Sequence, residues 1–276
     1  MDLDVEYDNR ARVPEHPAIF ERWQAASAAL RGTAEAADLG VPYGPGPRQI
    51  LDIVWPETDR RAPVVLFLHG GYWRSLHPRD HTFAARGCLA HGVAMAFAGY
   101  DLAPLVTIGT IMAQARAAAV TLYRLVGRPI VVCGHSAGGH LAAVLTATDW
   151  RALDVDTPAD AIAGGLGISG VYDLAPLRQT RLNETLKLGA DEARDWSPVL
   201  WRVPAGRSFD AFVGGAESSE FLRQSRDLTT AWSAAGVAAR CVEVEGANHF
   251  TVVDALADPR SPMVLRLVEL ARAALR

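Results

Sequence analysis

The feature that most constrains the fold of this chain is an alternation of short apolar runs with longer, alanine-rich segments. Most of the runs are apolar at consecutive positions, which is typical of strands buried on both faces of a sheet. The segments between several of them have the length of helices, and this alternation predicts an α/β fold with a parallel sheet between helical layers. The expected strands are residues 50–54, 64–68, 93–97, 130–133, 162–168, 209–213 and 239–244, and the expected helices are residues 14–30, 107–126, 137–149, 219–235 and 262–275.

Two stretches interrupt the alternation. Residues 41–47 contain three prolines and two glycines, and we expect a loop there because proline lacks an N–H donor and glycine loosens the backbone. Residues 174–207 carry three prolines together with Trp196 and Trp201 and are expected to form a cap or pocket wall between two strands. All 276 residues are expected to form one domain, in which residues 1–47 add an N-terminal helix and a loop.

The charge balance argues against nucleic acid as a partner. The 27 basic and 31 acidic residues give a formal net charge of −4, and the basic residues are dispersed along the chain instead of forming a phosphate-binding stripe. Lys187 is the only lysine, and it lies in a Leu-Lys-Leu-Gly sequence that matches neither a phosphate-binding loop nor a Schiff-base site. Neither nucleic-acid binding nor lysine chemistry is therefore expected.

The cysteines and the first residues indicate a cytoplasmic protein. Cys88, Cys133 and Cys241 are an odd number without close spacing, which is typical of reduced thiols and not of a disulfide framework or a zinc cluster. The N-terminal sequence is acidic where a signal peptide is basic, and no apolar run has the length of a membrane span. We expect no membrane, metal or cofactor partner, and the oligomeric state is left open, with a homodimer as one option.

The strongest motif is a serine between two glycines. Residues 134–138 read Gly-His-Ser-Ala-Gly, directly after an apolar run and directly before a helical segment. A sharp strand-to-helix turn would expose the Ser136 hydroxyl at a helix N-terminus, where N–H groups favour developing negative charge, and it needs glycines because side chains would collide there. We therefore predict that Ser136 is a nucleophile; the plainer alternative is a small-residue turn without a catalytic role.

A second element supports this prediction independently. Residues 69–73 read His-Gly-Gly-Tyr-Trp and follow the predicted strand 64–68. Two glycines after a strand let backbone N–H groups turn toward a substrate oxyanion. Gly70 and Gly71 are predicted to form an oxyanion hole with the N–H of Ala137, although a strand followed by Gly-Gly is, taken alone, more often an ordinary turn.

A serine hydroxyl needs a general base near neutral pH, and in this architecture the base comes last in the chain, after the acid. His249 is the only histidine beyond His140, and it lies in a loop after a predicted strand. We therefore predict that His249 is the base. His135 and His140 flank Ser136, and each is expected to point away from the hydroxyl or to line the pocket.

The acid is predicted from its place at the end of a strand. Glu217 lies in the loop that follows the predicted strand 209–213, where its carboxylate should reach the imidazole. Asp173 follows the preceding strand and remains a rival. Asp210 stands at the beginning of its strand, hence at the wrong end of a parallel sheet, and Asp254 is most simply a loop or helix-cap residue.

Two further patterns carry less weight. Residues 165–170 fit the dinucleotide pattern G-x-G-x-x-G, but they lie within a predicted strand and do not lead into a helix. His77 and His81 are four residues apart, yet no third metal ligand accompanies them. Neither a bound dinucleotide nor a metal site is expected.

Five segments together resemble the arylformamidase (kynurenine formamidase) branch of the α/β-hydrolase fold, and the resemblance runs from about residue 48 to the end of the chain. The segments are residues 69–73, 134–140, 169–174, 217–225 and 246–250. The resemblance implies a mostly parallel sheet of about eight strands and an acid a few residues before a Glu-Phe-x-Arg-Gln-Ser segment, which matches Glu217. Those formamidases carry aspartate there, and glutamate is an accepted acid in this fold.

These residues predict a serine hydrolase that works through an acyl-enzyme, and the resemblance implies that it cleaves a small aromatic N-formyl amide or ester. The expected substrate is uncharged or weakly acidic. The predicted aromatic pocket is formed by Tyr72, Trp73, His140, Trp196 and Phe250. One alternative is a broad-specificity carboxylesterase for short-chain aryl or alkyl esters, and a second is a non-catalytic binding module, which would be expected to have lost a member of the triad.

Overall fold

The computed structural model describes residues 1–56 and 60–276, and these residues contain an eight-stranded sheet. The strands are β1 (Ala37–Pro42), β2 (Ile50–Val54), β3 (Val64–Leu68), β4 (Ala94–Ala98), β5 (Ile130–His135), β6 (Ile162–Ile168), β7 (Ser208–Gly214) and β8 (Ala238–Val244). Their order across the sheet is β1-β2-β4-β3-β5-β6-β7-β8. β2 is antiparallel to both of its neighbours, and the adjacent pairs from β4 to β8 are parallel.

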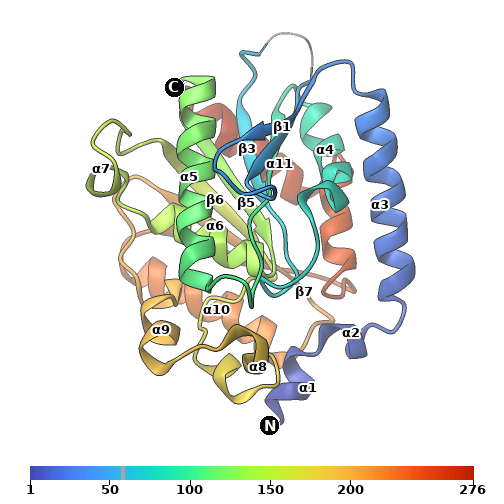
Figure 1. The fold of residues 1–276 in the computed structure, drawn as a ribbon, viewed down its shortest axis with the longest axis vertical. Coiled ribbons are helices and arrows are strands. Elements are labelled where there is room, and N and C mark those ends of the chain that lie inside the picture. Colours follow the sequence, from blue (N-terminus) through green and yellow to red (C-terminus); the bar gives the residue numbers. More distant parts are fainter. Residues whose placement is uncertain (57–59) are drawn as a thin grey trace.

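Helices cover both faces of this sheet (Figure 1). They are α1 (Leu3–Tyr7), α2 (Asn9–Arg12), α3 (His16–Thr33), α4 (Ala85–Leu89), α5 (Ile108–Val126), α6 (Ala137–Ala147), α7 (Trp150–Leu153), α8 (Asn183–Leu186), α9 (Ala190–Asp195), α10 (Ser219–Ala234) and α11 (Pro262–Ala273). α3, α4 and α11 contribute to the core on one face, and α5, α6 and α10 contribute to the core on the other. None of the described helices is both long and apolar enough to span a membrane.

The central strands are apolar at consecutive positions because both of their faces are covered. In β3, Val65 and Phe67 point into the core with α3 and α11, whereas Leu66 and Leu68 point into the core with α5 and α6. All five residues of β3 are buried, and each such apolar side chain contributes about 1.5–3 kcal/mol on burial. The predicted α/β fold with a mostly parallel sheet is therefore confirmed.

The predicted loop at residues 41–47 begins too early, because β1 continues through Val41 to Pro42. β1 is an edge strand that pairs only with β2, and an edge strand tolerates proline because one of its sides needs no N–H donor. The short helices α1 and α2 were likewise not expected from the sequence. Residues 174–207, expected as a cap or pocket wall, contain α8, α9 and two short 3-10 helices.

The parallel strands bring the sequence motifs to one edge of the sheet. Because neighbouring parallel strands end at the same side, the loops that follow them lie close together there. The loops after β3, β5, β6, β7 and β8 contain Gly70, Ser136, Asp173, Glu217 and His249, respectively. The sheet thus collects at one edge the residues that the sequence analysis singled out.

Candidate active site

Ser136 forms the turn between β5 and α6, and its backbone has φ 56° and ψ −117°. A residue with a side chain adopts this region only at a cost of about 1–3 kcal/mol, so the surroundings must hold it there. The Ser136 N–H donates to the Ile168 carbonyl of β6 at 2.8 Å. A side chain at Gly134 would collide with the Gly138 carbonyl, and one at Gly138 would collide with the Leu68 carbonyl. The glycines therefore permit a sharp turn that presents Ser136 at the N-terminus of α6.

His249 and Glu217 form a buried pair. The Nδ1 atom of His249 lies 2.6 Å from Oε2 of Glu217. The other carboxylate oxygen of Glu217 accepts hydrogen bonds from the Gly214 N–H at 2.7 Å and from the Ser169 hydroxyl at 2.5 Å. Three donors thus fix the carboxylate, and the carboxylate in turn fixes the ring of His249, which lines the same cavity as Ser136.

Two rings hold His249 from its sides. The ring of His135 lies 4.8 Å from that of His249, and its Nε2 atom is 2.8 Å from the His249 carbonyl oxygen. Phe221, near the start of α10, packs against His249 with ring centroids 4.5 Å apart. His135 lines the cavity but is bonded to the backbone of His249, so it supports the imidazole instead of replacing it.

The loop after β3 lies against the nucleophile. A Cβ atom at Gly70 would stand 2.9 Å from the His135 carbonyl and 3.1 Å from the Cβ atom of Ser136, so the backbone approaches closely only because Gly70 has no side chain. Gly71 has φ 102° and lines the cavity beside Ser136. Ala137 is the first residue of α6, where the N–H groups have no partner within the helix. Gly70 therefore places backbone against Ser136, Gly71 lines the same cavity, and Ala137 follows Ser136 directly in the chain.

A cavity of about 600 Å³ contains Ser136 and His249 in its wall. Three parts of the chain far apart in sequence build most of the rest: residues between 4 and 23, the loop after β3 and residues between 180 and 185. The lining residues are Asp4, Tyr7, Asp8, Asn9, Arg10, Phe20, Trp23, Gly71, Tyr72, Arg74, Ser75, Leu76, His135, Ser136, Thr180, Arg181, Leu182, Glu184, Thr185, His249 and Phe250.

The other acidic candidates contact groups away from His249. Asp173 accepts from the Ala175 N–H at 3.1 Å and lies 3.7 Å from the guanidinium of Arg223. Asp210, at the beginning of β7, pairs with Arg266 at 2.6 Å. Asp254 pairs with Arg22 and accepts from the indole N–H of Trp23. Of the four carboxylates weighed in the sequence, Glu217 is the one placed against the imidazole.

A family model described as the alpha/beta hydrolase fold matches residues 65–253, which is more than half of the chain. The chain is an α/β hydrolase. This hydrolase is 36% identical over 238 residues to a kynurenine formamidase from Salmo salar, covering 83% of this chain and 79% of that one. It is 32% identical to a kynurenine formamidase from Danio rerio, covering 80% and 77% of the two chains, and it belongs to their family.

Solved structures agree with this placement. A candidate thioesterase from Silicibacter sp. is 34% identical to the hydrolase, with a TM-score of 0.88 and coverage of 96% of this chain and 98% of that one. An esterase from Pyrobaculum calidifontis has a TM-score of 0.71 at 18% identity, covering 100% of this chain and 94% of that one. The second likeness shows the fold alone, and the hydrolase relatives argue against a non-catalytic binding module.

The structure corrects the predicted pocket wall of the hydrolase. Tyr72 and Phe250 line the cavity, but Trp73, His140 and Trp196 do not. Trp73 is fully buried with its ring edge-on to His140, and the Nε2 atom of His140 is 2.8 Å from the Trp196 carbonyl oxygen. Trp196 packs so closely on Gly109 of α5 that no side chain fits there. Trp73 and His140 are therefore buried packing residues, and the partly buried Trp196 packs on α5 instead of lining the cavity.

Three further aromatic residues, which were not predicted from the sequence, complete the wall. Tyr7 of α1 and Phe20 and Trp23 of α3 line the cavity of the hydrolase together with Phe250. The ring of Phe250 lies 5.1 Å from that of Phe20, in an edge-on arrangement. Trp23 lies in the predicted helix 14–30, where apolar residues recur at helical spacing; that spacing predicts burial but does not say what the helix covers.

Several histidines of the hydrolase are held neutral by burial. Burial lowers the pKa of His81 and of His140 to about 4, and it holds the pKa values of His69 and His135 well below the ordinary range. An uncharged His135 leaves the wall beside His249 without a competing positive charge. Its Nε2–H group donates to the His249 carbonyl oxygen while the ring stays uncharged.

These histidines should make stability fall in mild acid. Their pKa values are lower in the folded chain than the ordinary 6.5, so between about pH 4 and 6.5 the unfolded chain binds more protons. The contribution of these neutral histidines to the free energy of unfolding is fully present above pH 6.5. It is lost as pH falls, by about 1.4 kcal/mol per pH unit for each histidine that stays neutral. We expect urea unfolding midpoints to agree at about pH 7 and 8 and to be clearly lower at about pH 5. Equal midpoints at pH 7 and 5 would contradict this expectation.

Proposed function

We propose that this α/β hydrolase is a serine hydrolase that works through an acyl-enzyme. Ser136 attacks the substrate carbonyl, His249 takes its proton and later gives it to the leaving group, and Glu217 orients the imidazole. Backbone N–H groups near Gly70, Gly71 and Ala137 stabilise the oxyanion, and water then releases the acid. One observation carries the proposal: the strained turn at Ser136 faces the same cavity as a histidine whose Nδ1 atom is 2.6 Å from a buried carboxylate.

The relatives favour a formamide as the substrate. Curated proteins from Salmo salar and Danio rerio that match most of this chain are named kynurenine formamidase. The aromatic residues of the cavity wall, Tyr7, Phe20 and Phe250 among them, suit a substrate with an aromatic ring. The proposed reaction is therefore hydrolysis of a small aromatic N-formyl amide.

The charged side chains that line the cavity support a substrate that carries the carboxylate and ammonium groups of an α-amino acid. Arg10 and Arg74 line the cavity without a carboxylate within ion-pair distance in the described part of the chain; Arg10 reaches Ser75 at 3.5 Å and Arg74 reaches Thr185 at 3.4 Å. Asp8 and Glu184 line the same cavity. Arginine suits a carboxylate and a carboxylate suits an ammonium group, so both ends of an α-amino acid find partners here.

A carboxylesterase remains the second candidate. An esterase from Mycobacterium tuberculosis, LipC, is 34% identical over 171 residues, covering 55% of this chain and 41% of that one. The nucleophile, base and acid proposed here serve ester hydrolysis equally well. The two functions differ in what the cavity recognises beyond the carbonyl group.

A side-by-side comparison of kcat/KM for N-formylkynurenine and phenyl acetate tests the proposal. We expect the formamide to be preferred, and we expect Arg74→Ala to raise KM for the formamide about 10-fold, because a charged hydrogen bond of about 1.5 kcal/mol is lost. Phenyl acetate has no carboxylate, so its KM should not change in the variant. A preference for the ester, together with equal effects of Arg74→Ala on both substrates, would favour the carboxylesterase.

The remaining expectations from the sequence are proposals as well. A cytoplasmic location and function without a cofactor rest on composition, and residues 1–56 and 60–276 contain no group of three or more metal-ligating side chains that could hold an ion. The single-domain organisation is also a proposal. Residues 180–182, 184 and 185 line the cavity, which supports a cap role for residues 174–207. The partner we propose is the small substrate itself, and the oligomeric state is left open.

A further inference from the structure

The loop after β3 has a positive backbone φ at three consecutive residues, two of which carry side chains. Gly71, Tyr72 and Trp73 have φ values of 102°, 48° and 55°. For residues with side chains such a backbone costs about 1–3 kcal/mol each and persists only where other contacts hold it. Trp73 is held by its burial and by the Ala103 N–H, which donates to its carbonyl at 2.8 Å. The part of the loop next to Ser136, at Gly70 to Tyr72, needs a contact of its own to hold it.

Tyr72 ties this part of the loop to the N-terminal segment. Its hydroxyl donates to the carbonyl oxygen of Tyr7 at 2.8 Å and lies 3.3 Å from the Asn9 side-chain amide, which donates to it. Asn9 is buried and lines the cavity with Tyr7 and Tyr72. Burial raises the pKa of Tyr72 well above its ordinary value, so the hydroxyl keeps the proton that it donates.

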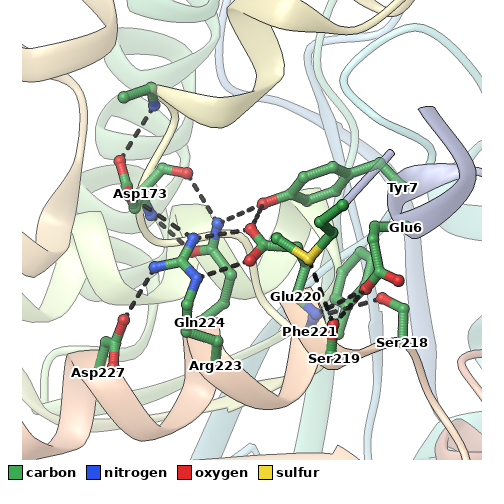
Figure 2. A network of polar contacts seen from close by, with 12 residues as sticks. Glu6, Tyr7, Asp173, Ser218, Ser219, Glu220, Phe221, Arg223, Gln224 and Asp227 are labelled. Atoms are coloured by element: carbon green, nitrogen blue, oxygen red, sulfur yellow. Dashed lines mark hydrogen bonds and ion pairs between the residues drawn. The ribbon is translucent and has the colours of Figure 1, made fainter. Parts of the chain in front are cut away.

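The N-terminal segment is itself anchored on α10 (Figure 2). The Tyr7 hydroxyl donates to Glu220 at 2.7 Å and accepts from the Gln224 amide at 2.9 Å. Glu6 accepts from the Ser219 hydroxyl at 2.7 Å and from the Glu220 N–H at 3.0 Å, so it occupies the N-terminus of this helix. A carboxylate at a helix N-terminus is stabilised by the free N–H groups there.

The N-terminal end of α10 also lies next to Glu217 and His249. Glu217 lies in the loop that leads into α10, and Phe221 packs on both Tyr7 and His249, with ring centroids 5.7 Å and 4.5 Å away. In the sheet, β3 and β7 are separated by β5 and β6, so strand pairing does not join the loop after β3 to the loop after β7. The chain from Tyr72 through Tyr7 to Glu220 does join them.

We propose that Tyr72 is a positioning residue that locks the oxyanion loop to Tyr7, so that residues 4–10 hold the oxyanion donors in register with the His249–Glu217 pair. This proposal rests on the proposed serine-hydrolase function. Without the Tyr72 hydroxyl, the left-handed backbone at Tyr72 can relax, and Gly70 and Gly71 beside it can shift. The loss then falls on the transition state, where the oxyanion forms, and not on binding of the substrate.

Tyr72→Phe tests the proposal with little change in packing. We expect kcat to fall about 10-fold with KM nearly unchanged. The reason is that the loop loses one supporting hydrogen bond, and the free energy of one hydrogen bond corresponds to about a 10-fold change in rate. Tyr43→Phe is the matched control: the Tyr43 hydroxyl also donates to a backbone carbonyl, that of Gly99 at 2.5 Å, but Tyr43 does not line the cavity. It should leave kcat and KM as in the wild type, whatever its effect on the thermal midpoint.

The rate at which a fluorophosphonate labels Ser136 gives a readout that needs no natural substrate. We expect labelling of Tyr72→Phe to be about 10-fold slower than that of the wild type, because phosphonylation also places an anionic oxygen among the oxyanion donors. Tyr7→Phe, which keeps the carbonyl but loses the anchor on α10, should slow labelling as well. Wild-type kcat and labelling rate in Tyr72→Phe would overturn the inference, as would a change in KM alone. Absence of labelling in the wild type would instead overturn the proposed function.

Discussion

Ser136→Ala is expected to lower kcat at least about 10⁴-fold and to abolish labelling by an organophosphonate, while the chain remains folded. The reason is that the acyl-enzyme cannot form without the hydroxyl, so only the oxyanion donors and the bound geometry remain to assist hydrolysis by water. Activity should be measured on the preferred substrate, and labelling by intact-protein mass, with the unfolding midpoint as the measure of folding.

The serine variant has a clear control. Ser233 lies on α10 with its hydroxyl bonded to the Ala239 carbonyl, and it does not line the cavity. Ser233→Ala should therefore label with one equivalent of reagent at the wild-type rate. Stoichiometric labelling that persists in Ser136→Ala would show that another residue is the nucleophile.

Glu217→Gln is expected to lower kcat by about 10²–10⁴-fold with a small effect on KM. The carboxylate accepts three hydrogen bonds, two of them on the oxygen that faces the Gly214 N–H and the Ser169 hydroxyl. In glutamine the oxygen is expected at that position, because the Gly214 N–H needs an acceptor. The amide group then faces Nδ1 of His249, and the ring must carry its proton on Nε2. An imidazole in that tautomer cannot accept the proton of Ser136.

Asp173→Asn is the comparison that makes this experiment decisive. Asp173 was the rival acid in the sequence, and its side chain contacts Ala175 and Arg223 instead of His249. We expect kcat of Asp173→Asn to remain within a few-fold of the wild type. Near-normal turnover in Glu217→Gln with a large loss in Asp173→Asn would transfer the role of the acid to Asp173.

The sequence predicted the parts of this molecule that depend on local patterns. The runs of consecutive apolar residues fold as the central strands because a strand with both faces buried is apolar at every position. Residues 134–138 fold as a tight turn because only glycine fits at positions 134 and 138. The placement of Glu217 and His249 after successive strands followed from the same regularity, since parallel strands end at one edge of the sheet.

The walls of the cavity could not be predicted in this way. Tyr7 contacts Glu220 across a separation of 213 residues, and nothing in either local sequence indicates the other. Trp73 and Trp196 are aromatic residues near predicted loops, and aromatic residues serve cores as readily as pockets. The direction of Trp73 depends on its own left-handed backbone and that of Trp196 on packing against Gly109, which are properties of the assembled fold.

The long separation between Tyr7 and Glu220 also has a consequence for folding. Closing so large a loop costs the most chain entropy when the intervening residues are disordered, and the cost is small once they are compact. The sheet can form from contacts among its own strands and helices. The hydrogen bond between Tyr7 and Glu220 stabilises the chain little before that sheet has formed, because its loop-closure entropy cost is then at its largest. We therefore expect the contacts between residues 4–10 and α10 to form after the sheet and to open before any of its strands separate.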